Sequence, residues 1–330
     1  MKKKIALVTG GYSGEATISY RSANTIYTHL DKEKYEVYKI DVNPEGWFYE
    51  GQDGSKTGIN KNDFTLDLEG KKISFDAVFI GMHGTPGEDG KLQGYFDMLR
   101  LPYTSCDAAT SALTFNKRYT TAVASVSGIP VAKSVVLFKH TGYHAEEILS
   151  ALQLPVFVKP NNGGSSIGMS KVSEPSGLTA AIEKAFKEDE QVLIEQMIEG
   201  REFTVGVFRS NNQITVLPIT EVEAHKEMEF FDFEAKYGGK STETTPAAIS
   251  DEWKQALETT AKKVYQVFNC RGVVRIDFIF NAKESRPYML EINTIPGQSA
   301  ASVIPQQVSA MGGNLQSFYS QLLDEAIQKH

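Results

Sequence analysis

Two strand-like segments near the carboxyl end, VVRIDFIF and YMLEINT, most constrain how this chain can fold. Side chains alternate across a strand, so Arg275 and Asp277 share one face of the first segment. Glu291 and Asn293 share one face of the second segment in the same way. The joining stretch NAKESRP has the composition of a hairpin loop. The sequence therefore predicts an antiparallel hairpin with one apolar face and one charged face.

The charged face of this hairpin brings two acids together. If the hairpin is symmetric about Glu284, Asp277 lies opposite Glu291, and the next pair is Arg275 with Asn293. Two carboxylates about 5 Å apart repel by roughly 3 kcal/mol at an effective dielectric constant of about 20. A magnesium ion would remove this repulsion, because proteins commonly hold Mg²⁺ with one or two carboxylates plus substrate phosphates. The alternative is an ordinary solvated hairpin face.

The residues after the hairpin favour the metal. The stretch NTIPGQSAAS contains a proline–glycine turn and then small residues that lead into a helix. Backbone N–H groups in such a turn form a concavity that accepts anions. A phosphate-bearing ligand beside the two acids is the expected partner of the ion.

A second stretch, VKPNNGGSSIGMS, ends a strand-like run in a loop of glycines and serines beside Lys159. Such a loop lets backbone N–H groups approach a phosphate closely, and the lysine would add a point charge. The alternative is a flexible turn with a chance lysine. No Walker motif is present, and TGGYSGEA has Ala16 where a dinucleotide fingerprint requires its third glycine, which argues against a dehydrogenase. Together with the paired acids, the loop indicates a metal–nucleotide site between two sheets.

Strand and helix signals alternate over the first third of the chain. This alternation predicts an α/β domain with a parallel sheet, whose ligand-binding turns lie at the carboxyl ends of the strands. The remaining two thirds carry further strands and helices, so we expect three domains at 1–105, 106–198 and 199–330. The metal site would lie in the third domain.

Two further segments bear on the site. We expect one helix from Ala108 to about Ala124, which carries Asn116 and Lys117. The polar stretch at 221–245 shows almost no regular pattern, and a loop this long in a compact domain is usually a working lid or disordered. We expect it to act as a lid.

Composition excludes several classes of partner. The net charge of −7 argues against a nucleic-acid partner, since binding phosphate backbones requires a basic face. The opening MKKKIALVTGG has the basic front of a signal peptide, but its apolar run is too short and is typical of a first buried strand. No stretch approaches the length of a membrane span. Cys106 and Cys270 lack metal-ligand spacing, so a reduced cytoplasm is expected.

Six motifs occur in a fixed order over more than two hundred residues: HGTPGEDGKLQG, KPNNGGSSIGMSKV, EGREFTVGV, FFDFEAKY, RGVVRIDF and LEINTIPG. In these motifs the chain resembles the D-alanine–D-alanine ligases of the ATP-grasp superfamily. The resemblance implies a Rossmann-like amino-terminal domain and two α+β domains that sandwich ATP. It also implies a homodimer, a role in peptidoglycan precursor synthesis, and a reaction through D-alanyl phosphate.

The resemblance further implies a set of residues that bind ATP and metal. Lys117 and Lys159 match lysines on the ATP phosphates, and Lys236 matches a lid lysine that reaches the γ-phosphate. The residues that match the adenine edge and the ribose are Glu195, Gln196, Ile198 and Glu202. The residues that match the ligands of two Mg²⁺ or Mn²⁺ ions are Asp277, Glu291 and Asn293, in agreement with the hairpin argument.

A second set would bind D-alanine and act on it. Glu15 matches the acid that holds the ammonium group of the first D-alanine, with Ser165 and Tyr237 as its hydrogen-bond partners. Arg275 and the backbone N–H of Gly297 match the donors to the oxyanion of the tetrahedral intermediate. In the family, a tyrosine at the position of Tyr237 accompanies dipeptide rather than D-alanyl-D-lactate synthesis.

The remaining matches concern both substrates. His83 matches a histidine near the first D-alanine, and Ser302 and Val303 match the positions that hold the carboxylate of the second. Taken alone, a single histidine is usually unremarkable. Likewise, Glu15 alone reads as a helix-start acid favoured by the helix dipole.

The chain departs from the family pattern at several positions. Phe231 and Phe233 stand where tyrosines are frequent, and Gln298 replaces a frequent methionine. Ala16 and Ala301 stand where polar residues are common. Because Gln298 and Ala301 are expected near the second substrate, they leave its identity open. The alternatives are another ATP-grasp carboxylate–amine ligase and a non-catalytic nucleotide-binding protein.

Overall fold

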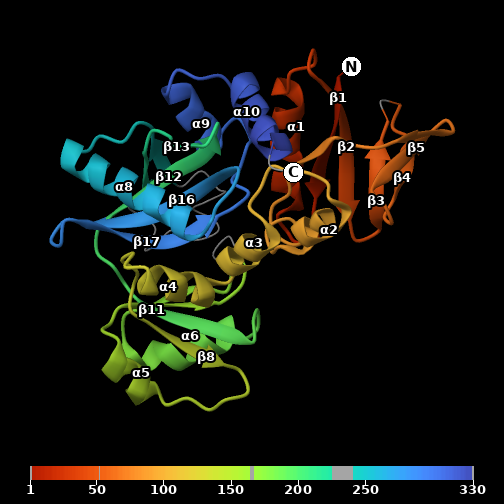
Figure 1. Ribbon diagram of the computed structural model, residues 1–330. Helices are drawn as coiled ribbons and strands as arrows, with labels where there is room; N and C mark the ends of the chain where they lie inside the picture. The colour runs from red at the N-terminus through yellow and green to blue at the C-terminus, as the bar shows by residue number, and fades with distance from the viewer. Residues whose placement is uncertain (1, 52, 164–166, 225–240, 329–330) are drawn as a thin grey trace.

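The computed structural model describes residues 2–51, 53–163, 167–224 and 241–328. These residues form three β-sheets, each with its own covering helices (Figure 1). The architecture is mixed α/β, as the sequence predicts. The three sheets lie within the expected domains 1–105, 106–198 and 199–330, whose boundaries stay a prediction.

The first sheet combines a parallel part with an antiparallel part. Its strand order is β6-β5-β4-β3-β2-β1-β7, with β1 parallel to both β2 and β7. The bounds of its strands and helices are β1 Lys3–Gly10, α1 Ala16–His29, β2 Tyr35–Asn43, β3 Gly46–Glu50, β4 Lys56–Asn60, β5 Thr65–Leu68, β6 Lys71–Ile73, β7 Ala77–Ile80 and α2 Lys91–Leu99.

The expected parallel arrangement is confirmed for β1, β2 and β7, whereas β3 to β6 add an antiparallel meander. The reason lies in the turn after β2. The Asn43 side chain accepts hydrogen bonds from the N–H groups of Glu45 (2.9 Å) and Gly46 (3.2 Å). This tight turn returns the chain as a hairpin instead of a helical crossover.

The second sheet has four antiparallel strands in the order β10-β9-β11-β8. Helices α5 and α6 cover it, and Ile148 and Ile182 from these helices are buried against Val156 and Val158. The bounds are β8 Ser134–Phe138, α5 Ala145–Ala151, β9 Val156–Pro160, β10 Ser170–Val172, the 3₁₀ turn Pro175–Gly177, α6 Leu178–Ala185 and β11 Gln191–Gln196.

The third sheet is antiparallel, in the order β15-β14-β12-β16-β17, with β13 beside β12. Helix α8 packs on it, where Trp253 stacks on Phe280 at a centroid distance of 4.2 Å. The bounds are β12 Arg201–Ser210, β13 Gln213–Val216, β14 Thr220–Ala224, β15 Ser241–Thr244, α8 Asp251–Val267, β16 Val273–Asn281, β17 Arg286–Asn293, α9 Val303–Ala310 and α10 Leu315–Gln328.

The prediction of a single helix at 108–124 is wrong. The chain forms two helices here, α3 Ala108–Phe115 and α4 Lys117–Val126. Asn116 adopts an extended conformation between them, and its side chain accepts a hydrogen bond from the N–H of Tyr119 at 3.1 Å. Asparagine side chains compete with the helical backbone in this way and favour caps. Both helices pack on the core of the third sheet, between it and the second (Figure 1).

The stretch expected to be nearly structureless at 221–245 begins and ends in strands. Glu221 pairs with Thr244 and Ala224 with Ser241, so β14 and β15 form an antiparallel pair. Residues 225–240, which include most of the expected lid with Phe231, Phe233, Lys236 and Tyr237, lie outside the described residues.

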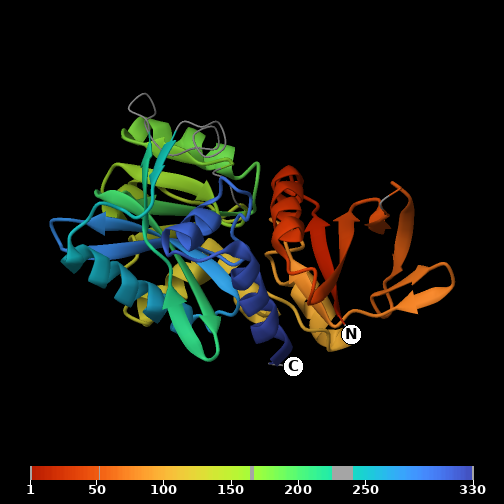
Figure 2. The ribbon, with the colours of Figure 1, turned by 90° about the horizontal axis from the view of Figure 1, so that it is seen from above.

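Helix α10 joins the first and third sheets, as Figure 2 shows. Its Tyr319 packs edge-on against Phe79 of β7, and its Phe318 packs edge-on against Phe208 of β12. The two sheets therefore share one apolar core at this place.

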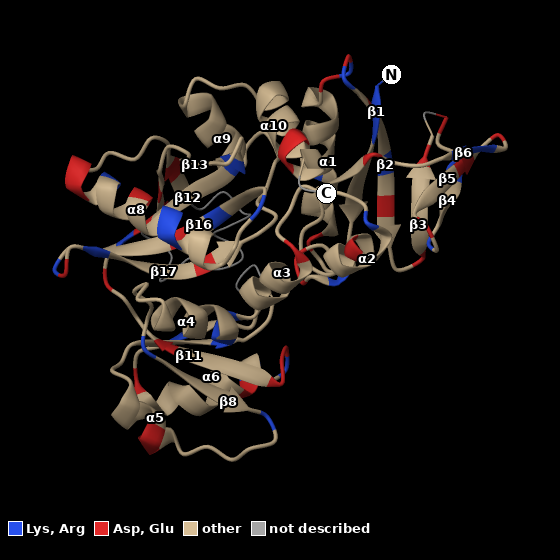
Figure 3. Ribbon diagram, in the orientation of Figure 1, with Lys and Arg blue, Asp and Glu red and all other residues tan. Residues whose placement is uncertain are grey.

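Residues of both charge signs occur throughout the described parts of the chain. Figure 3 shows Lys and Arg interspersed with Asp and Glu along the ribbon. Among the described residues, no helix combines the length and the apolar character that crossing a membrane requires.

Candidate active site

The expected cross-strand pairing of the hairpin is confirmed. Asp277 lies opposite Glu291, and Arg275 lies opposite Asn293. The register shifts after Asp277, so that Phe278 pairs with Met289. This irregularity is typical of a β-bulge, which changes the direction of nearby side chains and is frequent beside active sites. Symmetry about Glu284 therefore holds only on the side of the bulge where the acids lie.

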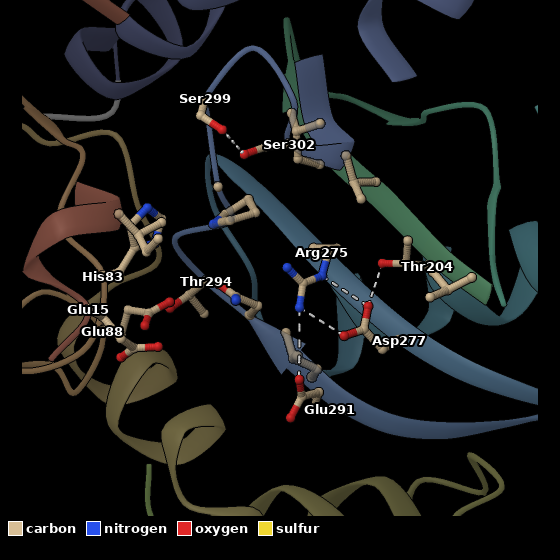
Figure 4. A pocket seen from close by; sticks show the side chains of 18 of the residues that line it. Glu15, His83, Glu88, Thr204, Arg275, Asp277, Glu291, Thr294, Ser299 and Ser302 are labelled. Carbon is tan, nitrogen blue, oxygen red and sulfur yellow. Dashed lines mark hydrogen bonds and ion pairs between the residues drawn. The ribbon is translucent and has the colours of Figure 1, made fainter. Parts of the chain in front are cut away.

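Arg275 lies between the two acids of the hairpin (Figure 4). Its Nε and Nη2 donate to Asp277 Oδ1 and Oδ2 at 3.0 and 2.9 Å, and Nη2 lies 3.8 Å from Glu291 Oε1. The hydroxyl of Thr204 on β12 also donates to Asp277 Oδ1. A guanidinium on the same face thus already compensates both acids, a contact that the sequence pattern did not predict.

The donor atoms at this face nevertheless suit a hard divalent cation. Asp277, Glu291 and Asn293 offer carboxylate and amide oxygens to one cavity, and oxygen ligands are what Mg²⁺ prefers. The described residues contain no group of three or more His, Cys, Asp or Glu able to hold a metal by themselves. The site therefore fits an ion that completes its coordination with water and ligand phosphates.

A cavity of about 340 Å³ opens between the first and third sheets beside this hairpin. Its wall contains side chains from the turns after β1 and β7, from α3 and α4, and from the segment after β17. The predicted site residues that line it are Glu15, His83, Lys117, Glu202, Arg275, Asp277, Glu291, Asn293, Gly297, Ser302 and Val303.

Four predicted ATP-binding residues lie away from this cavity, on and beside the second sheet. Lys159 forms an ion pair with Glu195, and both side chains are largely buried. Gln196 accepts a long hydrogen bond of 3.5 Å from the N–H of Gln153, and Ile198 follows β11. Ser165, Lys236 and Tyr237 lie outside the described residues.

Glu15 and Glu88 lie on the opposite wall of the cavity from Arg275 (Figure 4). The N–H of Gly84 donates to Glu88 Oε2 at 2.7 Å, and a Cβ atom at Gly84 would lie 2.6 Å from Glu15 Oε2. Gly84 also has a φ of 67°, a left-handed backbone conformation that favours glycine. The three residues form a compact acidic turn.

Glu88 is the functional candidate that the sequence reasoning missed. Burial, and then the negative charge of Glu15, raise the pKa of Glu88 to about 8. A carboxyl group with a raised pKa in a cleft is typical of a functional site. Its signal in the sequence was an acid inside the glycine-rich stretch HGTPGEDG, where the chain turns tightly.

Glu88→Gln should flatten the pH dependence of stability. A group with a raised folded-state pKa adds stability at low pH, which is lost as the pH rises from about 4.5 to about 8. The free energy of unfolding of the wild type should fall here by at most about 1.4 kcal/mol per pH unit from this group. Denaturant unfolding at a series of pH values measures this slope. An unchanged slope in Glu88→Gln, with the exposed Glu33→Gln as control, would contradict the assignment.

His83 is a buried, uncharged side chain that follows β7 and contacts helix α1. Its Nε2 lies 2.9 Å from Ser22 Oγ, and its backbone N–H donates to Ser19 Oγ at 2.9 Å. Burial lowers the pKa of His83 to about 4, partly offset by a hydrogen bond to the backbone of Ile295. The imidazole is therefore neutral at neutral pH, and it links α1 to the segment after β17.

The segment 294–303 forms a compact edge of the cavity. Ser299 Oγ and Ser302 Oγ lie 2.8 Å apart, and Ser302 precedes the first turn of α9 (Figure 4). A Cβ atom at Gly297 would lie 2.7 Å from Ser302 Oγ. The Gly297 backbone therefore lies close to the Ser302 side chain, beside the N-terminus of α9. This arrangement suits an anionic group.

Two family models match the chain: the D-ala D-ala ligase N-terminus over residues 4–106 and the D-ala D-ala ligase C-terminus over residues 123–324. The chain belongs to the D-alanine–D-alanine ligase family. It is 46% identical over 322 residues to a D-alanine–D-alanine ligase of Flavobacterium johnsoniae, with 98% of each chain covered. It is 43% identical to the ligase of Parabacteroides distasonis, with 99% and 98% covered.

Solved structures of the family confirm the ATP-grasp fold. The D-alanyl-alanine synthetase A of Vibrio cholerae matches with a TM-score of 0.89 and 29% identity over 100% of this chain and 99% of that one. The VanG D-Ala:D-Ser ligase of Enterococcus faecalis matches with a TM-score of 0.87 and 28% identity over 99% and 100%. A Bacillus anthracis D-alanine–D-alanine ligase complexed with ATP matches with a TM-score of 0.79 and 25% identity over 99% and 98%.

Proposed function

We propose that this protein joins two D-alanine molecules to D-alanyl-D-alanine, with ATP as the energy source, for peptidoglycan precursors. A carboxylate oxygen of the first D-alanine attacks the γ-phosphorus of ATP, and ADP leaves. The amine of the second D-alanine then attacks the acyl carbon, loses a proton, and expels phosphate. The observation that carries this proposal is the meeting of Glu15, the Arg275 hairpin and the Gly297–Ser302 segment at one cavity of the family fold.

The two walls of the cavity have complementary tasks in this proposal. Glu15 holds the ammonium group of the first D-alanine, because its side chain lines the cavity on the wall opposite Arg275 and a carboxylate there pairs with a cation. Arg275 and the N–H of Gly297 stabilise the oxyanion of the tetrahedral intermediate. Ser302 and the N–H of Val303, at the N-terminus of α9, hold the carboxylate of the second D-alanine.

The nucleotide side rests more on the family. Lys117, on the cavity wall, and Lys159 would bind the ATP phosphates, which requires Lys159 to exchange its contact with Glu195 for phosphate. Glu195, Gln196, Ile198 and Glu202 would line the adenine and ribose, as the matching positions do in the family. Ser165, Lys236 and Tyr237 are proposed on the family pattern alone.

We further propose that Asp277, Glu291 and Asn293 hold two Mg²⁺ or Mn²⁺ ions with ATP. A bound divalent ion supplies charge neutralisation on the phosphates during phosphoryl transfer. A cytoplasmic homodimer is proposed on the family resemblance, and the two free, buried cysteines suit a reducing compartment. Light scattering on the purified protein measures the oligomeric state.

The test of the function is release of phosphate from ATP with four partners: D-alanine, L-alanine, D-serine and D-lactate. We expect turnover with D-alanine alone. Turnover with D-alanine only when D-serine is added would indicate a D-Ala:D-Ser ligase, the activity named for the Enterococcus faecalis structure. Turnover with the other acids but not D-alanine would indicate a different ATP-grasp ligase, and no release with any would indicate a non-catalytic nucleotide-binding protein.

Glu15→Gln should weaken binding of the first D-alanine without changing the affinity for ATP. A hydrogen bond to a charged group contributes about 1.5–3 kcal/mol, so the dissociation constant of D-alanine should rise roughly 10- to 150-fold. Calorimetric titrations with D-alanine and with an ATP analogue measure the two affinities separately. Equal damage to both would argue that Glu15 is only a helix-start acid.

A further inference from the structure

We propose that Gln298 is a positioning residue for the ligation, which ties the Pro296–Gly297 turn to helices α1 and α10. This inference rests on the function proposed above, since it concerns the N–H of Gly297 that is assigned to the oxyanion. Gln298 itself touches no substrate in the proposal. It acts by holding its neighbour in place.

Gln298 makes three hydrogen bonds, which use both its side chain and its backbone. Its Oε1 accepts from the hydroxyl of Tyr319 at 3.2 Å, and its Nε2 donates to the carbonyl of Pro296 at 3.1 Å. Its backbone N–H donates to Ser22 Oγ at 3.1 Å. The side chain is only 4% exposed, whereas the next residues, Ser299 and Ala300, are half-buried and exposed. Gln298 is therefore the last inward anchor of the turn before the chain returns to the surface.

The groups that hold Gln298 are themselves firmly packed. Tyr319 is fully buried on α10, and its ring packs edge-on against Phe79 at 5.5 Å. Ser22 is fully buried on α1, and its Oγ lies 2.9 Å from Nε2 of His83. Burial also raises the pKa of Tyr319, so its hydroxyl remains a hydrogen-bond donor throughout the working pH range. Side chains from two helices thus contact Gln298, one at its backbone N–H and the other at its side-chain amide.

The Pro296–Gly297 turn must be positioned precisely for the proposed reaction. Gly297 lies so close to Ser302 that an added Cβ would be 2.7 Å from Ser302 Oγ. A shift of about 1 Å in a catalytic group can lower a rate about a hundredfold. The bond from Nε2 to the Pro296 carbonyl spans Gly297, so loss of the amide releases the peptide unit whose N–H is assigned to the oxyanion.

The experiment compares Gln298→Met, Tyr319→Phe and the double variant. Methionine, which is frequent at this position in the family, nearly keeps the volume of glutamine but forms neither side-chain hydrogen bond. The variant therefore tests whether this chain depends on the two bonds that a methionine cannot make. We expect kcat to fall roughly 10- to 100-fold in Gln298→Met and by a smaller factor in Tyr319→Phe. The double variant should be no slower than Gln298→Met, because residues in one network are not additive. The dissociation constant of ATP should stay unchanged in all three.

A matched control separates positioning from stability. Tyr265 is buried and donates to the carbonyl of Gly272 at 2.8 Å, so Tyr265→Phe also removes a buried hydroxyl. We expect it to lower the melting temperature but to leave kcat within about twofold. Full kcat in Gln298→Met, at a temperature where the variant is folded, would overturn the inference. If Gln298→Met does not fold, the comparison uses the two tyrosine variants. A kcat of Tyr319→Phe equal to that of Tyr265→Phe would then overturn the inference.

A second measurement does not depend on ligase activity. Hydrogen exchange of the peptide covering 295–302 should be faster in Gln298→Met than in the wild type. If the wild type forms no dipeptide, the proposed function fails while exchange still tests the anchor. If the wild type forms dipeptide and the variant exchanges at the wild-type rate, the anchor role fails alone.

Discussion

Arg275→Met should lower kcat of ligation by about 10²- to 10³-fold, the loss typical of removing one oxyanion donor. Its guanidinium lies between Asp277 and Glu291 at the cavity wall, so the charge is held in place before substrate binds. Steady-state phosphate release at saturating ATP and D-alanine measures kcat. Arg286→Met is the control, since Arg286 is an exposed arginine of the same hairpin that pairs with Glu284, and it should stay within about twofold.

The same variant has a second expected effect, on the protein without ligand. Removing the guanidinium leaves Asp277 and Glu291 facing each other without their shared cation, so the free energy of unfolding should fall by about 1–3 kcal/mol. Addition of Mg²⁺ should recover part of that loss, so it should stabilise Arg275→Met more than it stabilises the wild type. If neither the substitution nor Mg²⁺ changes the melting temperature, then neither the guanidinium nor Mg²⁺ relieves the repulsion between the two acids.

Glu291→Ala should lower kcat about a hundredfold and raise the Mg²⁺ concentration required for half-maximal activity. The expected loss follows from the several kcal/mol that a bound metal contributes to a developing phosphate charge. Calorimetric titration of Mg²⁺ into the protein with an ATP analogue measures binding apart from turnover. Glu284→Ala, at an exposed position of the same hairpin, is the control and should keep the wild-type kcat. Ligation that survives unchanged in Glu291→Ala would refute the metal assignment.

The elements that the sequence predicted well are those with a strong local pattern. The β16–β17 hairpin followed from side-chain alternation, and its register agreed at the two acids, although a bulge shifts it by one residue from Phe278 onward. Helix α8 (Asp251–Val267) has an equally local pattern, with Ser250 as its N-cap and Asp251 and Glu252 in its first turn. Both signals lie within one segment, so they need no knowledge of distant residues.

The elements that it missed depend on weak or competing local signals. The meander β3 to β6 consists of short, partly polar strands, which alternation does not reveal. The break at Asn116 arises because its side chain, rather than the next peptide, satisfies a helical N–H. The strands at the two ends of 221–245 form only because they pair with each other and with β12.

By itself, the sequence determined the chemistry of the candidate site: paired acids, a nearby arginine, a glycine-rich loop and a proline–glycine turn, in the order of one enzyme family. These are properties of residue type and spacing along a single chain. Only the tertiary structure decided which charges meet. It placed Arg275 between the acids and Gln298 against Tyr319, and it buried Glu88 near Glu15, which raises the pKa of Glu88. Burial and partner choice arise between segments distant in sequence, where local patterns carry no information.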